Sequence, residues 1–112
     1  MYPIVIFKYI GSPIYNMEYD ILRGYLSFMI LFFIDKNKEM SGNEIVNELE
    51  KRIERRINPG TIYPSLKRLK ENNLILIRKK IRKEIYYSLT QQGKRELEKG
   101  VKLFNKLFYD IK

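Results

Sequence analysis

The sequence predicts a mainly α-helical (α+β) fold, a winged helix-turn-helix with an added C-terminal dimerisation helix. Two observations carry this prediction: the order of the periodic segments, and a basic stretch that has the pattern of a β-hairpin. Three helices, a two-stranded hairpin and a last helix follow one another, which is the element order of a winged helix. We expect an N-terminal extension over residues 1–16, the winged helix over 17–89 and the dimerisation helix over 90–112.

The composition excludes several classes of site. The 112 residues include no cysteine and no histidine, which excludes disulfides, zinc sites and thiolate or imidazole catalysis. There is no glycine-rich phosphate loop and no acidic cluster with metal-ligand spacing, so we expect no cofactor, no metal and no enzyme. The longest apolar run, 28–34, is far shorter than the roughly 20 residues that span a bilayer. The N-terminus does not have the pattern of a signal peptide, and we expect a soluble, cytoplasmic protein.

The positive charge is concentrated in one part of the chain. The formal net charge is +9, and residues 51–83 contain twelve Lys or Arg against two Glu, an excess of ten. A block of one sign favours a polyanionic partner, with nucleic acid ahead of an anionic membrane surface. The alternative is a lysine-rich solvated surface, although such surfaces usually interleave acidic residues.

The first two helices are predicted from their apolar patterns. Residues 18–35 form a helix that is apolar on nearly every side from Tyr25 onward, and such a helix is buried. A chain of this size cannot bury it alone, which indicates that a partner subunit covers part of it. The second helix begins with a capping box formed by Ser41 and Glu44, and its inward stripe includes Ile45 and Leu49.

The segment "NPGTIYPSLKRLKENN", residues 58–73, predicts a third helix with an unusual start. Proline is tolerated there because the first N–H groups of a helix have no partner within it. Ile62, Leu66 and Leu69 share one face at helical spacing. That face is inward, so the outward side and its flanks hold the candidate DNA-contacting residues Gly60, Thr61, Tyr63, Pro64, Ser65, Lys67 and Arg68. Asn72-Asn73 is a plausible left-handed stop.

The hairpin and the last helix follow. Residues 74–77 and 84–89 have strand patterns, and the tip between them carries Arg78, Lys79, Lys80, Arg82 and Lys83. Thr90 then caps a helix that runs to near the C-terminus. Its apolar residues repeat at spacings of four and three, a coiled-coil-like seam made of Leu97, Val101, Phe104, Phe108 and Ile111 and widened by Leu107. We favour packing between subunits for this seam over packing on the chain's own first helix.

Four segments resemble the PadR family of transcriptional regulators. "PGTIYPSLKRLKENNLI" is similar to the family's recognition-helix signature. "ILRGYLSFMILFFI", "SGNEIVNELEKR" and "IYYSLTQQGKREL" resemble its first helix, its second helix, and its second wing strand with the start of the last helix. The resemblance covers about residues 20–100 and implies a homodimeric DNA-binding repressor, whose last helix packs on the N-terminal helix of the partner.

The chain departs from the family pattern at three points. Asn43 stands where the family usually has an aromatic residue, and the wing tip lacks the glycine often seen there. A single helix after the wing is typical of the short branch of the family.

The physical role of each candidate residue follows from its chemistry. Gly60 has no side chain to hold DNA away, and the free N–H groups at a helix start favour a phosphate oxygen. Thr61 and Tyr63 can donate hydroxyl hydrogen bonds to phosphates, although Tyr63 could equally brace the helix as a half-buried aromatic. Pro64, Ser65, Lys67 and Arg68 would enter the major groove, where a cationic side chain reads guanine. For Ser65 a solvated position is the favoured alternative.

The flanking cations have less specific roles. The five basic wing residues would follow phosphates or an adjacent minor groove, which adds affinity rather than sequence preference. Arg52, Arg55 and Arg56 could clamp the flanking backbone, with solvated surface the better interpretation for at least one of them.

We expect a sequence-specific, DNA-binding transcriptional regulator, a repressor, that binds a palindromic duplex as a homodimer. The alternative is a winged-helix protein that coats DNA without sequence preference or binds RNA. A small-molecule effector among the aromatic residues is possible but not indicated, because plain core packing explains them better.

Overall fold

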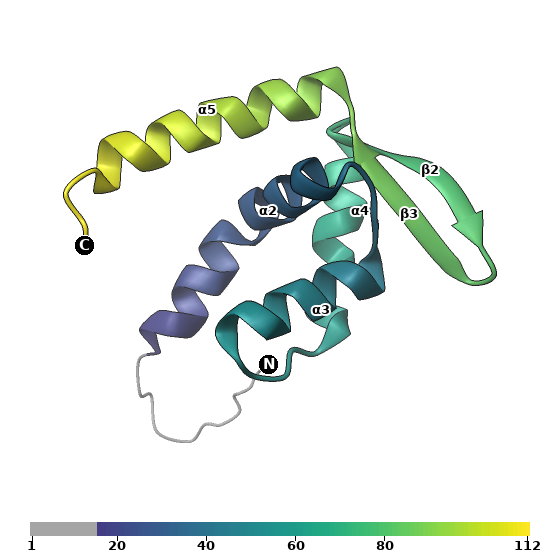
Figure 1. Ribbon diagram of the computed structural model, residues 1–112, viewed down its shortest axis with the longest axis horizontal. Helices are drawn as coiled ribbons and strands as arrows, with labels where there is room; N and C mark the ends of the chain where they lie inside the picture. The colour runs from purple at the N-terminus through teal and green to yellow at the C-terminus, as the bar shows by residue number, and fades with distance from the viewer. Residues whose placement is uncertain (1–15) are drawn as a thin grey trace.

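The computed structural model describes residues 16–112, which form four α-helices and a three-stranded antiparallel sheet (Figure 1). The expected N-terminal extension, 1–16, lies outside the described residues except for Asn16. In chain order the elements are α2 (Met17–Asn37), β1 (Met40–Ser41), α3 (Gly42–Ile53), the 3₁₀ turn η1 (Pro59–Thr61), α4 (Tyr63–Glu71), β2 (Ile75–Ile81), β3 (Glu84–Leu89) and α5 (Gln91–Phe108). The predicted mainly α fold with a β wing is confirmed.

Helix α2 is the central support of the domain. Asn16 caps its start, because the Asn16 side-chain oxygen accepts a hydrogen bond from the Tyr19 N–H at 2.9 Å. Its C-terminal half is buried through residues such as Ile30 and Ile34, while Met17 and Ile21 at its start are exposed. The part of the chain that is described has no helix both long and apolar enough to cross a membrane.

Helix α3 begins with the predicted capping box. The Ser41 hydroxyl accepts a hydrogen bond from the Glu44 N–H at 3.2 Å, and the Glu44 carboxylate accepts one from the Ser41 N–H at 3.0 Å. The predicted stripe residues Ile45 and Leu49 are buried in the core, together with Val46.

The segment predicted as one helix from Pro59 is divided in two. Pro59 begins η1 and Pro64 lies in the first turn of α4, so each proline starts its own segment. The left-handed stop is confirmed at Asn73, with a φ of 61°. The Leu74 N–H donates to the Leu69 carbonyl at 2.9 Å, which closes the end of α4.

The sheet has the strand order β1-β3-β2. The sequence did not predict β1, because a strand of two residues leaves no periodic pattern. Strand β2 continues to Ile81, which pairs with Glu84, so only Arg82 and Lys83 form the turn. The prediction that the hairpin tip spans 78–83 was therefore wrong for Arg78, Lys79 and Lys80, which extend the strand because pairing with β3 continues past the bulge after Ile77.

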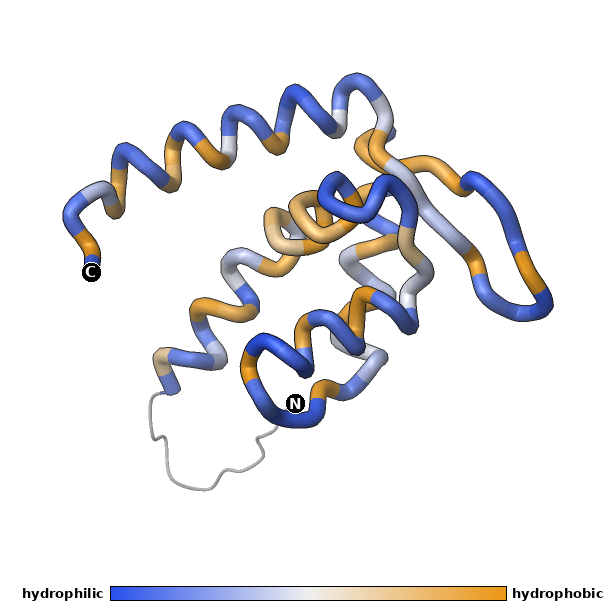
Figure 2. Tube along the Cα trace, viewed as in Figure 1, coloured by the Kyte–Doolittle hydropathy of each residue, from blue (hydrophilic) through white to orange (hydrophobic). Residues whose placement is uncertain are grey.

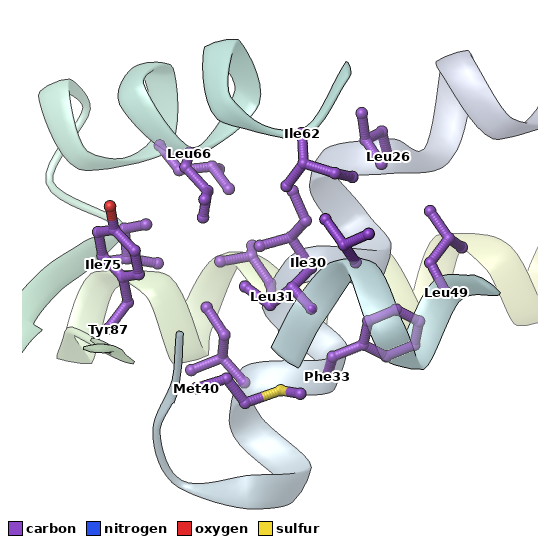
Figure 3. Close-up of a cluster of buried hydrophobic side chains, with 14 of the residues drawn as sticks. Leu26, Ile30, Leu31, Phe33, Met40, Leu49, Ile62, Leu66, Ile75 and Tyr87 are labelled. Carbon is purple, nitrogen blue, oxygen red and sulfur yellow. The ribbon is translucent and has the colours of Figure 1, made fainter. Parts of the chain in front are cut away.

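One hydrophobic core joins all the helices and the base of the wing (Figure 3). Its least exposed side chains come from four elements: Ile30, Ile34, Ile45, Ile62, Leu66 and Ile75. Helix α5 enters this core at Leu97 and approaches closely at Gly93, where an added Cβ would lie 2.0 Å from the Leu74 carbonyl oxygen. This contact fixes where α5 leaves the domain, beside the root of the wing.

Candidate nucleic-acid interface

The exposed face of η1 and α4 presents few side chains that are already engaged. Gly60, Thr61, Pro64 and Lys67 are all exposed, and the buried Ile62 and Leu66 anchor the opposite face in the core. Lys67 makes no ion pair or hydrogen bond within residues 16–112. On this face the backbone at Gly60 is not covered by a side chain, and the ammonium group of Lys67 is unpaired.

Ser65 does not lie on that face. It is 5% exposed and packs inward beside Leu66, so both predictions made for it, a groove contact and a solvated position, were wrong. Ile62, Ser65 and Leu69 occur at spacings of three and four and share the inward side of the helix. A small hydroxyl fits an inward position where the helix lies close to its neighbours.

The sequence suggested that the N–H groups at the start of this segment are free to bind phosphate. In the structure they are already hydrogen-bonded. The Asn58 side chain accepts a hydrogen bond from the Gly60 N–H at 2.9 Å. The Thr61 N–H donates to the Asn58 carbonyl and the Ile62 N–H to the Pro59 carbonyl, each at 2.9 Å. The turn satisfies its own donors, so an approach to phosphate at Gly60 depends on the missing side chain rather than on unpaired N–H groups.

Tyr63 both braces the domain and remains accessible. Its side chain is 45% exposed, and its ring lies against Gly42, where an added Cβ would be 2.8 Å from the ring carbon Cε1. Its hydroxyl lies 3.5 Å from the Asn43 side-chain oxygen. Burial, and to a lesser extent Tyr63, raises the pKa of Tyr87 at the base of β3. The Tyr63 ring therefore packs against the first turn of α3 at Gly42.

Arg68 lies on the flank of α4 that faces α2. Its guanidinium donates a hydrogen bond to the Ser27 hydroxyl at 3.2 Å, although the residue as a whole is exposed. In this position the guanidinium joins two helices of the domain. Lys67, one residue earlier, is the better placed of the two candidate base-reading cations.

The wing, defined here as β2, β3 and the turn between them, projects from the body of the domain (Figure 1). Arg78, Lys80, Arg82 and Lys83 are exposed and make no ion pair within the described chain. Lys79 is different: its ammonium lies 2.6 Å from the Glu39 carboxylate and 5.1 Å from the centre of the Tyr86 ring. The hydrogen bond that Lys79 donates to Glu39 raises the pKa of Lys79. Four of the five predicted wing cations are therefore available to an anionic ligand.

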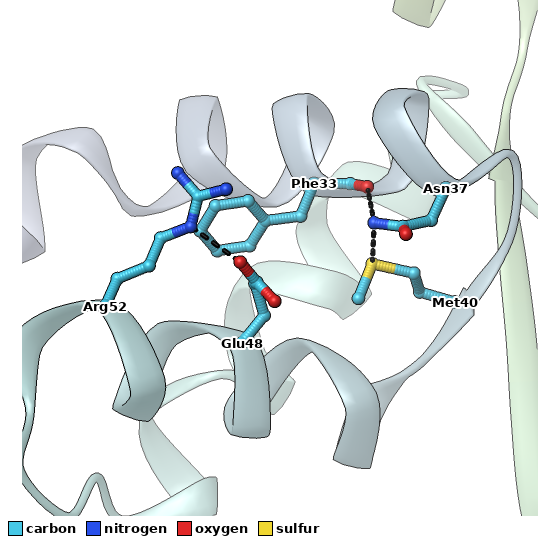
Figure 4. Close-up of polar contacts among 5 residues, drawn as sticks. All are labelled: Phe33, Asn37, Met40, Glu48 and Arg52. Atoms are coloured by element: carbon cyan, nitrogen blue, oxygen red, sulfur yellow. Dashed lines mark hydrogen bonds and ion pairs between the residues drawn. The ribbon is translucent and has the colours of Figure 1, made fainter.

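The three arginines that end α3 and follow it are paired with acids. Arg52 donates to Glu48 at 2.7 Å, and its guanidinium lies 4.8 Å from the centre of the Phe33 ring (Figure 4). Arg55 pairs with Glu18, and Arg56 lies 3.8 Å from Glu50. The hydrogen bond from Arg52 lowers the pKa of Glu48. These pairs leave the clamp predicted for the three arginines without support.

The predicted dimerisation residues on α5 and beyond it divide into two groups. Leu97 is 6% exposed because it packs into its own domain. Phe104 is 38% exposed, although its ring centre lies 6.2 Å from that of Phe28 and 5.0 Å from that of Phe108. Val101, Leu107 and Ile111 are exposed, as is Leu103, which the seam pattern missed because it is out of step with the repeat. Figure 2 shows the apolar side of α5 turned toward α2.

The apolar groove between α2 and α5 has a volume of about 310 Å³ and is lined by Phe28, Gly100, Leu103, Phe104 and Leu107 among others. Gly100 allows the two helices to approach, since an added Cβ would lie 2.9 Å from the Phe28 ring. Within the described chain no group of three or more acidic residues is placed to hold a metal ion.

Comparison with known proteins relates this arrangement to one family. The family model described as the transcriptional regulator PadR-like family matches residues 30–99. A PadR-like transcriptional regulator from Bacillus cereus is 28% identical, with a TM-score of 0.72 over 82% of this chain and 92% of that one. No curated protein matches the chain.

Two further structures share the fold. A PadR family transcriptional regulator from Eggerthella lenta is 23% identical, with a TM-score of 0.70 over 81% of both chains. RosR of H. salinarum is 22% identical, with a TM-score of 0.66 over 77% of both chains. Together with the family match over 30–99, the wing and the α4 face identify the chain: it belongs to the PadR-like family of transcriptional regulators, which bind DNA.

Proposed function

We propose that this protein is a sequence-specific repressor that binds palindromic duplex DNA as a homodimer. The observation that carries the proposal is the juxtaposition of two exposed surfaces, the α4 face (Gly60, Thr61, Pro64 and Lys67) and the wing with its four unpaired cations. An exposed helix face fits the major groove, and a cationic hairpin beside it fits the phosphate backbone.

Each surface has a separate role. Lys67 would donate to a guanine edge, and Thr61 and Tyr63 would donate to phosphates where Gly60 lets the backbone come close. Lys80, Arg82 and Lys83 of the wing would neutralise phosphates and supply affinity for any duplex. Sequence preference therefore depends on α4, and most of the salt dependence depends on the wing.

The homodimer is supported by apolar surface that the single chain leaves exposed. Leu103 and Leu107 of α5 are 56% and 59% exposed, beside the apolar groove, and Met17 at the start of α2 is 57% exposed. Apolar side chains gathered along one helix are typical of a surface that another subunit covers. Two copies joined there would present two α4 faces, and half-sites one DNA turn apart, roughly 34–36 Å, would form a palindrome.

We infer repression from the stretch of duplex that such a dimer would cover. A protein that occupies two adjacent half-sites excludes other proteins from the same stretch of duplex. Transcription in vitro from a template that carries the selected site, with and without the protein, tests this part of the proposal.

Selection of bound duplexes from a random pool tests the central claim. We expect a palindromic sequence bound roughly 10³-fold more tightly than bulk duplex. Enrichment of no sequence, with binding that still weakens steeply with salt, would indicate a protein that coats DNA instead. Preference for RNA over duplex DNA would also contradict the proposal.

Sedimentation of the protein tests the dimer separately. We expect a dimer for the natural sequence and a monomer for the double variant Leu103→Glu/Leu107→Glu, because both side chains are exposed in the single chain and their replacement leaves its core intact. A natural protein that sediments as one chain would refute the homodimer while leaving DNA binding open.

A further inference from the structure

Asn43 contacts two elements that the proposed function assigns to DNA. It lies in the first turn of α3, and its side-chain N–H donates to the carboxylate of Glu84, the first residue of β3. Its side-chain oxygen lies 3.5 Å from the Tyr63 hydroxyl at the start of α4. One exposed amide therefore lies between the wing and the beginning of the α4 face.

The neighbouring Gly42 makes this contact possible. An added Cβ at that position would lie 2.8 Å from ring carbon Cε1 and 3.0 Å from the hydroxyl of Tyr63. The absence of a side chain at Gly42 lets the Tyr63 ring lie against α3, with its hydroxyl near Asn43. Gly42 and Asn43 therefore contact the start of α4 through Tyr63, and Asn43 also contacts β3 through Glu84.

Glu84 adds an electrostatic reason for the contact. It directly follows the turn residues Arg82 and Lys83, and it is an acid at the end of the wing that would approach phosphates. A free carboxylate there would pair with those cations or repel the DNA. The hydrogen bond from Asn43 engages one oxygen of this carboxylate, Oε2, and Arg82 and Lys83 make no ion pair within the described chain.

We propose that Asn43 is a positioning residue that joins the wing to the α4 face, so that both elements meet the duplex as one rigid unit. The inference rests on the proposed DNA-binding function, which it deepens. Without the contact, the end of the hairpin beyond the Ser41–Tyr86 pair would move relative to α4, and Glu84 would be free to pair with the wing cations. Both changes weaken DNA binding, and the second also lowers its dependence on salt.

The matched pair Glu84→Gln and Glu84→Ala tests the contact directly. Both variants remove the negative charge, but only glutamine keeps an oxygen that can accept from Asn43. We expect Glu84→Gln to bind the selected duplex at least as tightly as the natural protein, and Glu84→Ala to bind about fivefold less tightly than Glu84→Gln. Equal affinities for the two variants would overturn the proposal.

Asn43→Ala has a matched control on the same helix. Asn47 lies one turn later, is exposed and makes no side-chain hydrogen bond within residues 16–112. We expect Asn43→Ala to weaken binding about fivefold and Asn47→Ala to change it less than twofold. In the Glu84→Ala background, Asn43→Ala should have little further effect, because the partner is already absent. An equal effect of Asn43→Ala in both backgrounds would refute the contact.

A measurement without DNA separates this inference from the proposed function. Hydrogen exchange of the β2 and β3 amides should become faster in Asn43→Ala than in Asn47→Ala, while the thermal midpoint stays the same. If the natural protein binds no duplex, the proposed function fails, and the exchange rates still decide on the contact. Unchanged exchange in Asn43→Ala would refute the positioning role even if DNA binding is confirmed.

Discussion

Two groups of cations that look alike in the sequence differ in the structure. Arg52, Arg55 and Arg56 at the end of α3 each pair with an acid, whereas four of the five wing cations make no ion pair within the described chain. The acids that neutralise the first group come from α2 and α3, including Glu18, which is far away in the sequence. A net charge summed along a segment therefore overstates the surface available to DNA, because pairing with acids elsewhere in the fold has to be subtracted.

The largest effect should come from removing two unpaired wing cations. We expect Lys80→Ala/Arg82→Ala to weaken binding of any duplex on the order of tenfold at low salt. The slope of affinity against salt should fall by about two units, one for each lost phosphate contact. A titration with selected and random duplexes at several salt concentrations measures both quantities.

The matched control for that variant is Arg55→Ala/Arg56→Ala, which removes the same charge from the paired group. We expect a change in affinity of less than about twofold, since each of these guanidinium groups already lies beside an acid, Glu18 for Arg55 and Glu50 for Arg56. Equal losses for the two double variants would mean that pairing does not distinguish the groups.

The next effect should come from Lys67, the unpaired cation of α4. We expect Lys67→Ala to bind the selected duplex about fivefold less tightly and random duplex almost unchanged, because a base contact is lost while phosphate contacts remain. Competition between the two duplexes measures the difference. A uniform loss for both would place Lys67 on the backbone, together with the wing cations.

A smaller and opposite effect should follow from releasing Lys79. We expect Glu39→Gln to strengthen duplex binding about twofold, since Lys79 would then be a fifth free cation on the wing. Its ammonium stays protonated in both proteins, because the ordinary pKa of a lysine lies well above neutral pH and Glu39 only raises the pKa of Lys79 further. The change should therefore be the same in mildly acidic and mildly alkaline buffer, and a pH-dependent change would point to another group.

Replacing Arg52 should lower the stability of the fold and leave DNA binding unaffected. Arg52→Ala removes the contact with the Phe33 ring and the pair with Glu48, and we expect the thermal midpoint to fall by about 4 °C. In the natural protein the pKa of Glu48 is lowered. The pair therefore stabilises the fold fully at pH values above the ordinary carboxyl pKa, and this stabilisation is lost as the pH falls through the lowered pKa. The variant should therefore lose less stability on acidification, which unfolding scans at several pH values would measure.

The sequence predicted the elements with strong periodic patterns and missed those that depend on tertiary contacts. The capping box at Ser41 and the left-handed Asn73 follow from local rules. The burial of Ser65, the ion pair of Arg55 with Glu18 and the bridging position of Asn43 depend on which residues the fold brings together. The strand β1 pairs with β3 across more than forty residues of chain, and no local pattern marks it.

The turn of the wing contains one residue in a backbone conformation that glycine adopts most easily, Arg82, with a φ of 58°. An arginine there costs about 1–2 kcal/mol relative to a relaxed backbone. The protein therefore keeps a positive charge at the very end of its hairpin at the expense of the hairpin's own folding. Arg82→Gly would relax the turn and remove the cation in one substitution. The variant should therefore have a more stable wing and a lower affinity for DNA.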